Sequence, residues 1–302
     1  MTLPISVVIP VYNNRATIVE AVRSAVTQTA EPAEVLVVDD GSSDGSPEAV
    51  EQEFGPHVTV IRQANGGPSR ARNRGIDAAT QPLVAFLDAD DVWHPNKLES
   101  QYAVLARSDD IGVVASDWVR RPEDWPSLPT EWRAEPLSYQ EILVLNRFQT
   151  STVLARTTLV RAVGGFDPKL DGAEDWDLWV RLAARSRVVK IPWPLVVYRD
   201  VPTGYSKDVW RVYVTMQGLL DKQRDRAPLS PAALAEIEAW HHLRFAVAFL
   251  LLKDVDHARR ALAGALAPPL RRHVWRATTR YLLPFLRARL RRRRGRARAS
   301  TV

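Results

Sequence analysis

Short runs of apolar, mostly β-branched residues recur through the first third of the chain, and each run is followed by a polar cluster. Runs of this kind are typical of strands buried on both faces of a parallel sheet. We expect such strands at residues 5–11, 35–38, 58–61 and 83–87, with helices at 15–27 and 69–79. Strands and helices that alternate at this spacing predict an α/β protein, with a mostly parallel sheet that helices cover on both faces.

The second half of the chain has a less regular pattern. After about residue 208 the apolar spacing becomes helical throughout. We predict an α/β domain at 1–210, a helical extension at 211–269 and an arginine-rich amphipathic tail at 270–302. The remaining expected elements are strands at 113–116, 152–155, 188–191 and 195–198, the last two kept short by prolines, and helices at 157–163 and 174–184.

The polar clusters fall where the predicted strands end. In open α/β sheets, ligands bind beyond the carboxyl ends of the strands. Tyr12, the pair Asp39 and Asp40, and the acidic run 88–91 are therefore expected to meet at one edge of the sheet, although they lie far apart in the sequence.

Three aspartates, Asp88, Asp90 and Asp91, follow the predicted strand 83–87. Carboxylates so close together repel one another unless a cation lies among them, and carboxylate oxygens suit Mg²⁺ or Mn²⁺. Such an ion would also neutralise the charge that builds on a departing diphosphate. The alternative is a solvated acidic turn that caps the following helix.

The segment DDGSSDG at 39–45 allows two interpretations. A carboxylate there can accept a hydrogen bond from a nucleotide base or a ribose hydroxyl, or the segment is a glycine turn with helix-capping side chains. Tyr12 either offers a face on which a base stacks or is an ordinary, partly buried tyrosine. Arg70, Arg72 and Arg74 lie on different faces of the predicted helix, so only some of them can bind phosphate.

The segment EDWD at 174–177 opens a predicted helix. Acidic residues in a first turn interact favourably with the helix dipole, which accounts for them without a catalytic role. Alternatively, a carboxylate that is crowded by other acids and flanked by Trp176 and Trp179 has a raised pKa and can act as a general base.

A series of segments in the order found here resembles glycosyltransferase family 2, a large family of inverting transferases with the GT-A fold. The resemblance covers residues 4–205. It is carried by SVVIPVYN (6–13), VVDDGSSD (37–44), NGGPSRARN (65–73), FLDADD (86–91), GGFD (164–167) and EDWDL (174–178).

The resemblance implies a site for a nucleotide sugar. Pro10, Tyr12 and Asp40, with Asp39 as a neighbour, correspond to the pocket for the nucleotide base. Arg70 corresponds to an arginine that contacts the base or a phosphate.

The same resemblance assigns roles to the acidic residues. Asp88 and Asp90 correspond to the DxD pair of the family, which holds the ribose and the metal–diphosphate group, and Asp91 is expected to share the metal. Asp175 corresponds to the general base of the family's Glu-Asp motif, with Glu174 beside it.

One departure from the family pattern concerns the segment after Tyr198. Many members carry a histidine two residues after this Tyr-Arg pair, and this chain does not. The departure puts in doubt a metal or phosphate contact in this segment, although Arg199 is still expected to reach the diphosphate.

The resemblance as a whole implies an inverting glycosyltransferase. It would use Mn²⁺ or Mg²⁺ to move a sugar from a nucleotide-diphosphate sugar to an acceptor hydroxyl, in cell-surface polysaccharide or glycolipid synthesis. The expected partners are that donor and a glycan or lipid-linked acceptor. Two other functions stay open: a catalytically inactive binding protein with the GT-A fold, and a metal-dependent nucleotidyltransferase.

Composition and charge limit these possibilities. The absence of cysteine excludes a disulfide scaffold, a thiolate zinc site and a cysteine nucleophile.

The formal net charge of +6 is unevenly distributed, because residues 270–302 contain 12 arginines and no acidic residue. A basic tail indicates an anionic partner, and apolar residues among the arginines of 270–290 favour a membrane surface over nucleic acid. Pro284 is expected to kink this helix, and a solvated tail is the alternative.

No apolar run is long enough to span a membrane, and residues 1–10 lack the basic region of a secretory signal. The expected location is the cytoplasm, with peripheral attachment at the inner face of the cell membrane as a further hypothesis.

Overall fold

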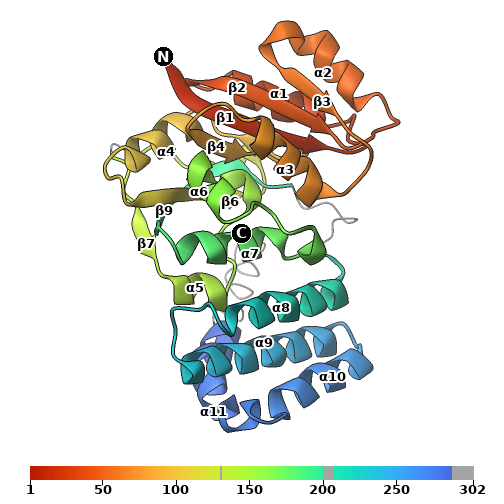
Figure 1. Ribbon diagram of the computed structural model, residues 1–302, viewed down its shortest axis with the longest axis vertical. Helices are drawn as coiled ribbons and strands as arrows, with labels where there is room; N and C mark the ends of the chain where they lie inside the picture. Colours follow the sequence, from red (N-terminus) through yellow and green to blue (C-terminus); the bar gives the residue numbers. More distant parts are fainter. Residues whose placement is uncertain (130, 200–206, 288–302) are drawn as a thin grey trace, which may run out of the picture. The chain divides into compact units, whose positions relative to one another are not determined.

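The computed structural model describes residues 1–129, 131–199 and 207–287, and the chain divides into two compact units, Met1–Gly204 and Tyr205–Val302. Figure 1 colours the chain along the sequence, so that the second unit is the one drawn in teal and blue. The division lies near the predicted boundary at residue 210. A separate tail from residue 270 stays a prediction, and its residues 288–302 lie outside the described residues.

The described strands of the first unit form one nine-stranded sheet with the order β3-β2-β1-β4-β8-β6-β9-β5, and β7 pairs with β9. The pairs β1–β2, β1–β4 and β2–β3 are parallel, whereas β8 is antiparallel to β4 and β6. The carboxyl ends of β1, β2 and β4 therefore meet at one edge, as predicted. The strands are β1 (Thr2–Val11), β2 (Glu31–Asp39), β3 (Thr59–Arg62), β4 (Leu83–Phe86), β5 (Val92–Trp93), β6 (Ile111–Val119), β7 (Glu135–Leu137), β8 (Leu154–Arg156) and β9 (Arg187–Val197).

Helices cover both faces of this sheet. On one face, α1 (Ile18–Val26), α2 (Ser46–Phe54) and α4 (Lys97–Leu105) share a buried apolar cluster with alternate residues of β1. On the other face lies α3 (Pro68–Ala78), whose Gly75 allows a close approach, because a Cβ there would lie 2.3 Å from Val8 Cγ1. The other helices of the unit are α5 (Tyr139–Val144), α6 (Thr157–Ala162) and α7 (Glu174–Ala183), and α7 packs Trp179 against Phe86.

The prediction of two short strands at 188–191 and 195–198 is wrong, because β9 is one continuous strand. Its register with β6 shifts where Ile191 pairs with Ser116 and Pro194 with Asp117. An irregularity of this kind lets a strand carry prolines, which cannot donate a ladder hydrogen bond.

The first helix begins at Ile18 rather than at residue 15. The backbone N–H of Asn14 donates to Ser46 Oγ at 3.0 Å, and that of Arg15 donates to Asp44 Oδ2 at 2.9 Å. These hydrogen bonds fasten the segment before the helix to the turn after β2.

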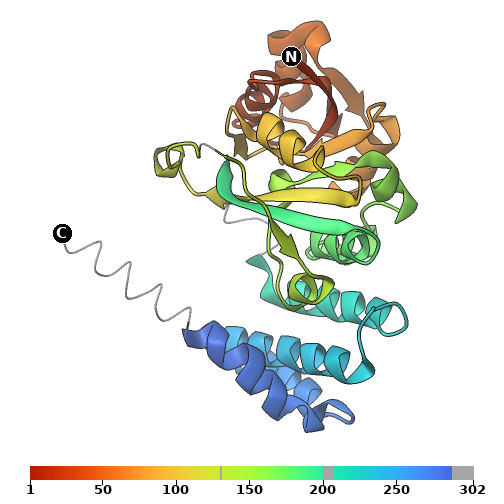
Figure 2. The same cartoon turned by 90° about the vertical axis from the view of Figure 1, so that its left-hand side faces the viewer.

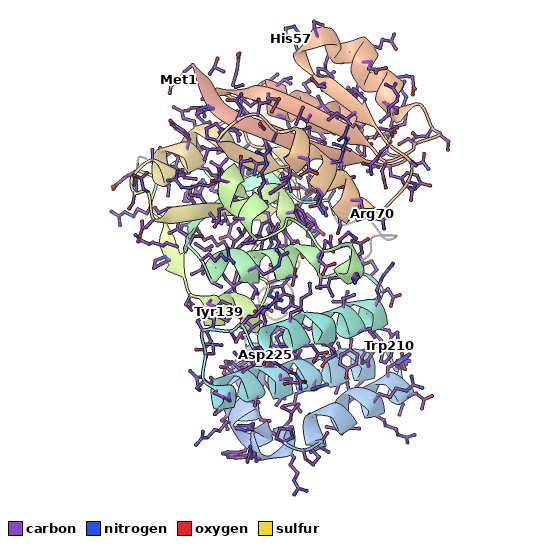
Figure 3. The ribbon with its side chains drawn as sticks, viewed as in Figure 1. Met1, His57, Arg70, Tyr139, Trp210 and Asp225 are labelled. Carbon is purple, nitrogen blue, oxygen red and sulfur yellow. The ribbon has the colours of Figure 1, made fainter. Side chains whose placement is uncertain are left out.

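The described residues of the second unit are helical: α8 (Val209–Gln223), α9 (Pro231–Leu251), α10 (Val255–Leu266) and α11 (Val274–Ala277). Helix α9 begins after Ser230, whose Oγ caps the helix by accepting a hydrogen bond from the Ala233 N–H. Trp210, labelled in Figure 3, packs its ring against Phe249 and His257 and so joins α8 to α9 and α10.

A π-helical turn at Thr278–Leu282 ends two residues before Pro284, and a kink at the proline itself stays a prediction. Proline has no N–H and clashes with the preceding turn, and a wider turn accommodates it. Within the described ranges, no helix combines the length and the apolar character that crossing a bilayer requires.

Candidate functional site

The turns after β1 and β2 are hydrogen bonded to each other. Asn13 adopts a φ of 48° and donates its backbone N–H to Ser42 Oγ at 3.0 Å, and its Oδ1 accepts the Ser43 N–H at 2.8 Å. Ser42 in turn donates its backbone N–H to Asp39 Oδ1 at 3.0 Å. Tyr12 is 53% exposed, an exposure that fits both interpretations of this residue. Its ring is open to a ligand at the strand ends.

Asp40 fastens a further loop to this edge. Its buried carboxylate accepts hydrogen bonds from Gln63 Nε2 at 2.7 Å and from the backbone N–H groups of Gly66 and Gly67 at 2.9 and 2.8 Å. The segment 39–45 also forms the expected glycine turn, with φ near +80° at both of its glycines. Binding of a nucleotide base by Asp40 stays a prediction.

Asp91 anchors the acidic run that follows β4. It is fully buried, and its two oxygens accept hydrogen bonds from Ser151 Oγ at 2.5 Å and from the Arg199 backbone N–H at 2.9 Å. Ser151 Oγ also accepts the Asp88 backbone N–H at 3.0 Å. Burial, followed by the charges of Asp88 and Asp90, raises the pKa of Asp91 well above its usual value. Asp91 thus ties the acidic run to the end of β9.

Asp88 and Asp90 are only partly buried. Burial, and then the negative charge of Asp88, raises the pKa of Asp90 to about 6. The acidic run does not cap the following helix, because α4 begins after Asn96 without a side-chain cap. The capping interpretation is therefore wrong.

Arg72 joins the acidic run to the first turn of α7. Its Nη2 lies 2.8 Å from Asp88 Oδ1, its Nη1 lies 3.1 Å from Glu174 Oε1, and its guanidinium lies over the Phe166 ring at 5.2 Å. Burial by itself would lower the pKa of Arg72, but the charges of Asp88 and Glu174 raise it above its usual value.

Asp175 follows Glu174 in the first turn of α7, and its side chain is partly buried. Its oxygens accept hydrogen bonds from Asn146 Nδ2 at 3.1 Å and from the Trp176 backbone N–H at 2.6 Å. Burial, and then the charge of Glu174, raises the pKa of Asp175 to about 7, while the Trp176 N–H, Arg72 and Asn146 oppose the rise.

The remaining predicted residues lie at the margins of this cluster. Pro10 pairs with Val38 within the sheet. Arg199 forms an ion pair with Glu20 of α1 at 2.7 Å. Arg70 is exposed on α3 (Figure 3), two residues before the buried Arg72.

Sequence reasoning missed three residues of the cluster. Arg72 was grouped with its neighbours, although it lies three positions before Gly75, on the face of α3 that packs against the sheet. Ser151 and Asn146 stand in segments without a recognisable pattern. Only the folded chain brings them to the acidic groups that they contact.

The acidic pair fits a metal ion that also has phosphate ligands. Within the described ranges, no three acidic or histidine side chains converge in a way that would hold a metal by themselves. Mg²⁺ is commonly held by one or two carboxylates together with phosphate oxygens of a substrate. Asp88 and Asp90 match that donor set, whereas both oxygens of Asp91 are engaged elsewhere.

The sequence model described as glycosyl transferase family 2 matches residues 6–162. The chain belongs to this family. It is 40% identical over 123 residues to the uncharacterized glycosyltransferase YibD of Escherichia coli K12, an alignment that covers 40% of this chain and 36% of YibD. The chain thus spans little more than a third of the length of the first curated relatives it matches.

Solved structures place this member of glycosyl transferase family 2 in the GT-A fold. Staphylococcus aureus TarS, residues 1–349 in complex with UDP-GlcNAc, superposes with a TM-score of 0.70 at 22% identity, over 89% of this chain and 82% of that one. The mannosyltransferase PcManGT of Pyrobaculum calidifontis, in complex with GDP-Man and Mn²⁺, superposes with a TM-score of 0.63 at 23% identity, over 92% and 80%.

Arg72→Met is expected to lower the free energy of unfolding by about 3 kcal/mol, because removing one partner of a buried ion pair leaves uncompensated charge. Urea unfolding at neutral pH measures the change. Arg70→Met, on the exposed face of the same helix, serves as the control and should change the stability by less than about 0.5 kcal/mol. Equal stability of the two variants would contradict the anchoring role of Arg72.

Proposed function

We propose that this protein is an inverting glycosyltransferase, which moves a sugar from a nucleoside diphosphate sugar to an acceptor hydroxyl, with Asp175 as the general base. The observation that carries the proposal is the link through Arg72. Arg72 pairs with Asp88 of the acidic run and with Glu174, the residue directly before Asp175, whose pKa is about 7. A base with a pKa near neutrality takes a proton efficiently at neutral pH.

The edge of the sheet supplies groups for the nucleotide. The exposed Tyr12 ring offers a stacking face, with Pro10, Asp39 and Asp40 beside it at the strand ends. Arg70 and Arg199 are the arginines proposed to reach the phosphates. TarS in complex with UDP-GlcNAc and PcManGT in complex with GDP-Man support a nucleoside diphosphate sugar as donor, without choosing the base or the sugar.

Asp88 and Asp90 are the residues proposed to hold Mn²⁺ or Mg²⁺ together with the diphosphate. When bound, such an ion neutralises the charge on the departing diphosphate. The Mn²⁺ in the PcManGT complex supports this choice. Asp91 acts instead through the Ser151 and Arg199 hydrogen bonds, which hold the acidic run in place.

The reaction is proposed to be one displacement. The carboxylate of Asp175 accepts the proton of the acceptor hydroxyl, and the acceptor oxygen forms a bond to the anomeric carbon. The bond from that carbon to the diphosphate oxygen breaks, its electron pair leaves with the nucleoside diphosphate, and the anomeric configuration inverts. Asn146 and the Trp176 N–H orient the carboxylate.

The proposed acceptor is a glycan or a lipid-linked saccharide of cell-surface polysaccharide or glycolipid synthesis, by resemblance to the family.

The reaction products distinguish glycosyl transfer from the two competing functions. A glycosyltransferase releases a nucleoside diphosphate, a nucleotidyltransferase releases pyrophosphate, and an inactive binding protein releases neither. A screen of nucleotide sugars with Mn²⁺, read by thermal shift and then by product analysis, identifies the donor.

Asp90→Ala is expected to abolish the Mn²⁺-dependent binding of a nucleoside diphosphate, because it removes one of the two proposed metal carboxylates. Calorimetry with and without Mn²⁺ measures the affinity. The fold should stay intact, since Asp90 is partly exposed and contributes little to the core. An affinity equal to that of the wild type would remove Asp90 from the metal site.

Asp175→Asn is expected to lower kcat by about 10²–10⁴-fold, the usual contribution of a general base, while donor binding persists. Steady-state kinetics and calorimetry on the same preparation separate the two effects. The control is Asp77→Asn, an exposed aspartate on α3, which should leave kcat unchanged. Wild-type turnover in Asp175→Asn would leave the helix-dipole interpretation as the only role of this residue.

The pH dependence of turnover follows from the raised pKa of Asp175, which is about 7. A base must be deprotonated, so kcat at saturating donor should rise about tenfold per pH unit below pH 7 and level off above it. Burial and the charge of Glu174 raise this pKa, and the Trp176 N–H, Arg72 and Asn146 oppose the rise. A flat profile across this pH range, with donor binding preserved, would exclude Asp175 as the base.

A further inference from the structure

A stripe of exposed apolar side chains runs along α10 in the second unit. Val255, Leu262 and Leu266 are 48%, 43% and 51% exposed, and Arg259 lies among them at helical spacing. The adjoining face of the helix carries the small residues Ala258, Ala261 and Ala265, which are buried. Because α10 packs on α9 through its alanines, the larger apolar side chains of the stripe face away from the core.

The next segment repeats this arrangement. In residues 270–287, Ala277 is buried, and the rings of Tyr281 and Phe285 pack against Trp240 of α9. Trp275 is 76% exposed, and Leu283 is 40% exposed. In both Figure 1 and Figure 2, α10 and this segment form the layer of the second unit farthest from α8.

Basic residues surround these apolar side chains. Residues 253–287 contain eight lysines and arginines and two aspartates. Arg259 and Arg276 have side chains that are 79% and 70% exposed, and Arg276 lies 3.3 Å from Glu236. We call the combined surface the basic apolar face; it consists of Val255, Arg259, Leu262, Leu266, Arg271, Arg272, Trp275, Arg276 and Leu283.

We propose that the basic apolar face docks on the surface of an anionic lipid bilayer, with the apolar side chains inserted at the headgroup level and the arginines paired with lipid phosphates. The sequence predicted attachment through 270–302 alone, and the structure extends the surface to α10. Exposed tryptophan and leucine among arginines are the composition that interfacial binding requires. The docking does not depend on the proposed reaction.

Other binding partners would complement the basic apolar face less well than an anionic bilayer. A second copy would bring one basic face against another, and like charges repel. Residues 288–302 carry seven arginines and no acid, so their charge does not complement it either. Nucleic acid would pair with the arginines but would leave Leu262, Leu266 and Trp275 without an apolar environment.

The test is co-sedimentation of the full chain with two kinds of vesicle, one of phosphatidylcholine alone and one of phosphatidylcholine mixed with phosphatidylglycerol. The wild type should bind the anionic vesicles only, and binding should weaken as salt screens the arginines. Arg271→Gln with Arg272→Gln should lower the partition coefficient about 25-fold, at about a factor of five for each basic residue. Leu262→Ser with Trp275→Ala should lower it by at least a similar factor.

Val214→Ser serves as the matched control, because Val214 is an apolar residue of α8 with a similar exposure of 49%. It should sediment as the wild type does. Circular dichroism and thermal unfolding check that every variant is folded. The proposal is overturned if the wild type does not sediment, if Leu262→Ser with Trp275→Ala binds as well as the control, or if duplex DNA competes the protein away from the vesicles completely.

Discussion

The arrangement of the site depends on the two ion pairs that the buried guanidinium of Arg72 forms with Asp88 and Glu174. A charged group can be buried only when opposite charges compensate it. Asp88 and Glu174 provide this compensation from two segments that are far apart in the chain, the loop after β4 and the first turn of α7. Because the guanidinium is planar and donates in fixed directions, it sets the distance between these carboxylates as well as neutralising them. The proposed metal pair and the proposed base thus share one support.

The rest of the edge is assembled by hydrogen bonds from backbone to side chain. Parallel pairing of β1, β2 and β4 brings the three turns together, and the turns then hold one another. Asp40 binds two glycine N–H groups of the loop before α3, and so positions the helix that carries Arg72. Asp91 does the same for the end of β9 through the Arg199 N–H. Buried carboxylates that accept several N–H groups are effective anchors because each N–H would otherwise be unsatisfied.

These anchors explain what the sequence can and cannot predict. The strands and the edge where they end follow from apolar runs and polar clusters, so Tyr12 and the acidic run were found. The sequence does not distinguish a carboxylate that faces a ligand from one that faces the protein, and Asp91 was therefore grouped with the proposed metal residues. The choice between Arg70 and Arg72 depends on which side of α3 meets the sheet, which the close approach of Gly75 to Val8 fixes. Ser151 and Asn146 have no local signal because their partners are distant in sequence.

The two interpretations of the segment 174–177 are compatible, and together they account for the basicity of Asp175. Burial and the charge of Glu174 raise its pKa, and this rise alone would leave the group protonated and inactive as a base. The Trp176 N–H at the start of α7, the Asn146 amide and the charge of Arg72 favour the ionised form and bring the pKa to about 7. The folded state therefore holds this proton to higher pH than the unfolded chain, and its stability falls as the pH rises from the usual aspartate range towards 7. The loss of stability and the proton affinity of the base have the same physical origin.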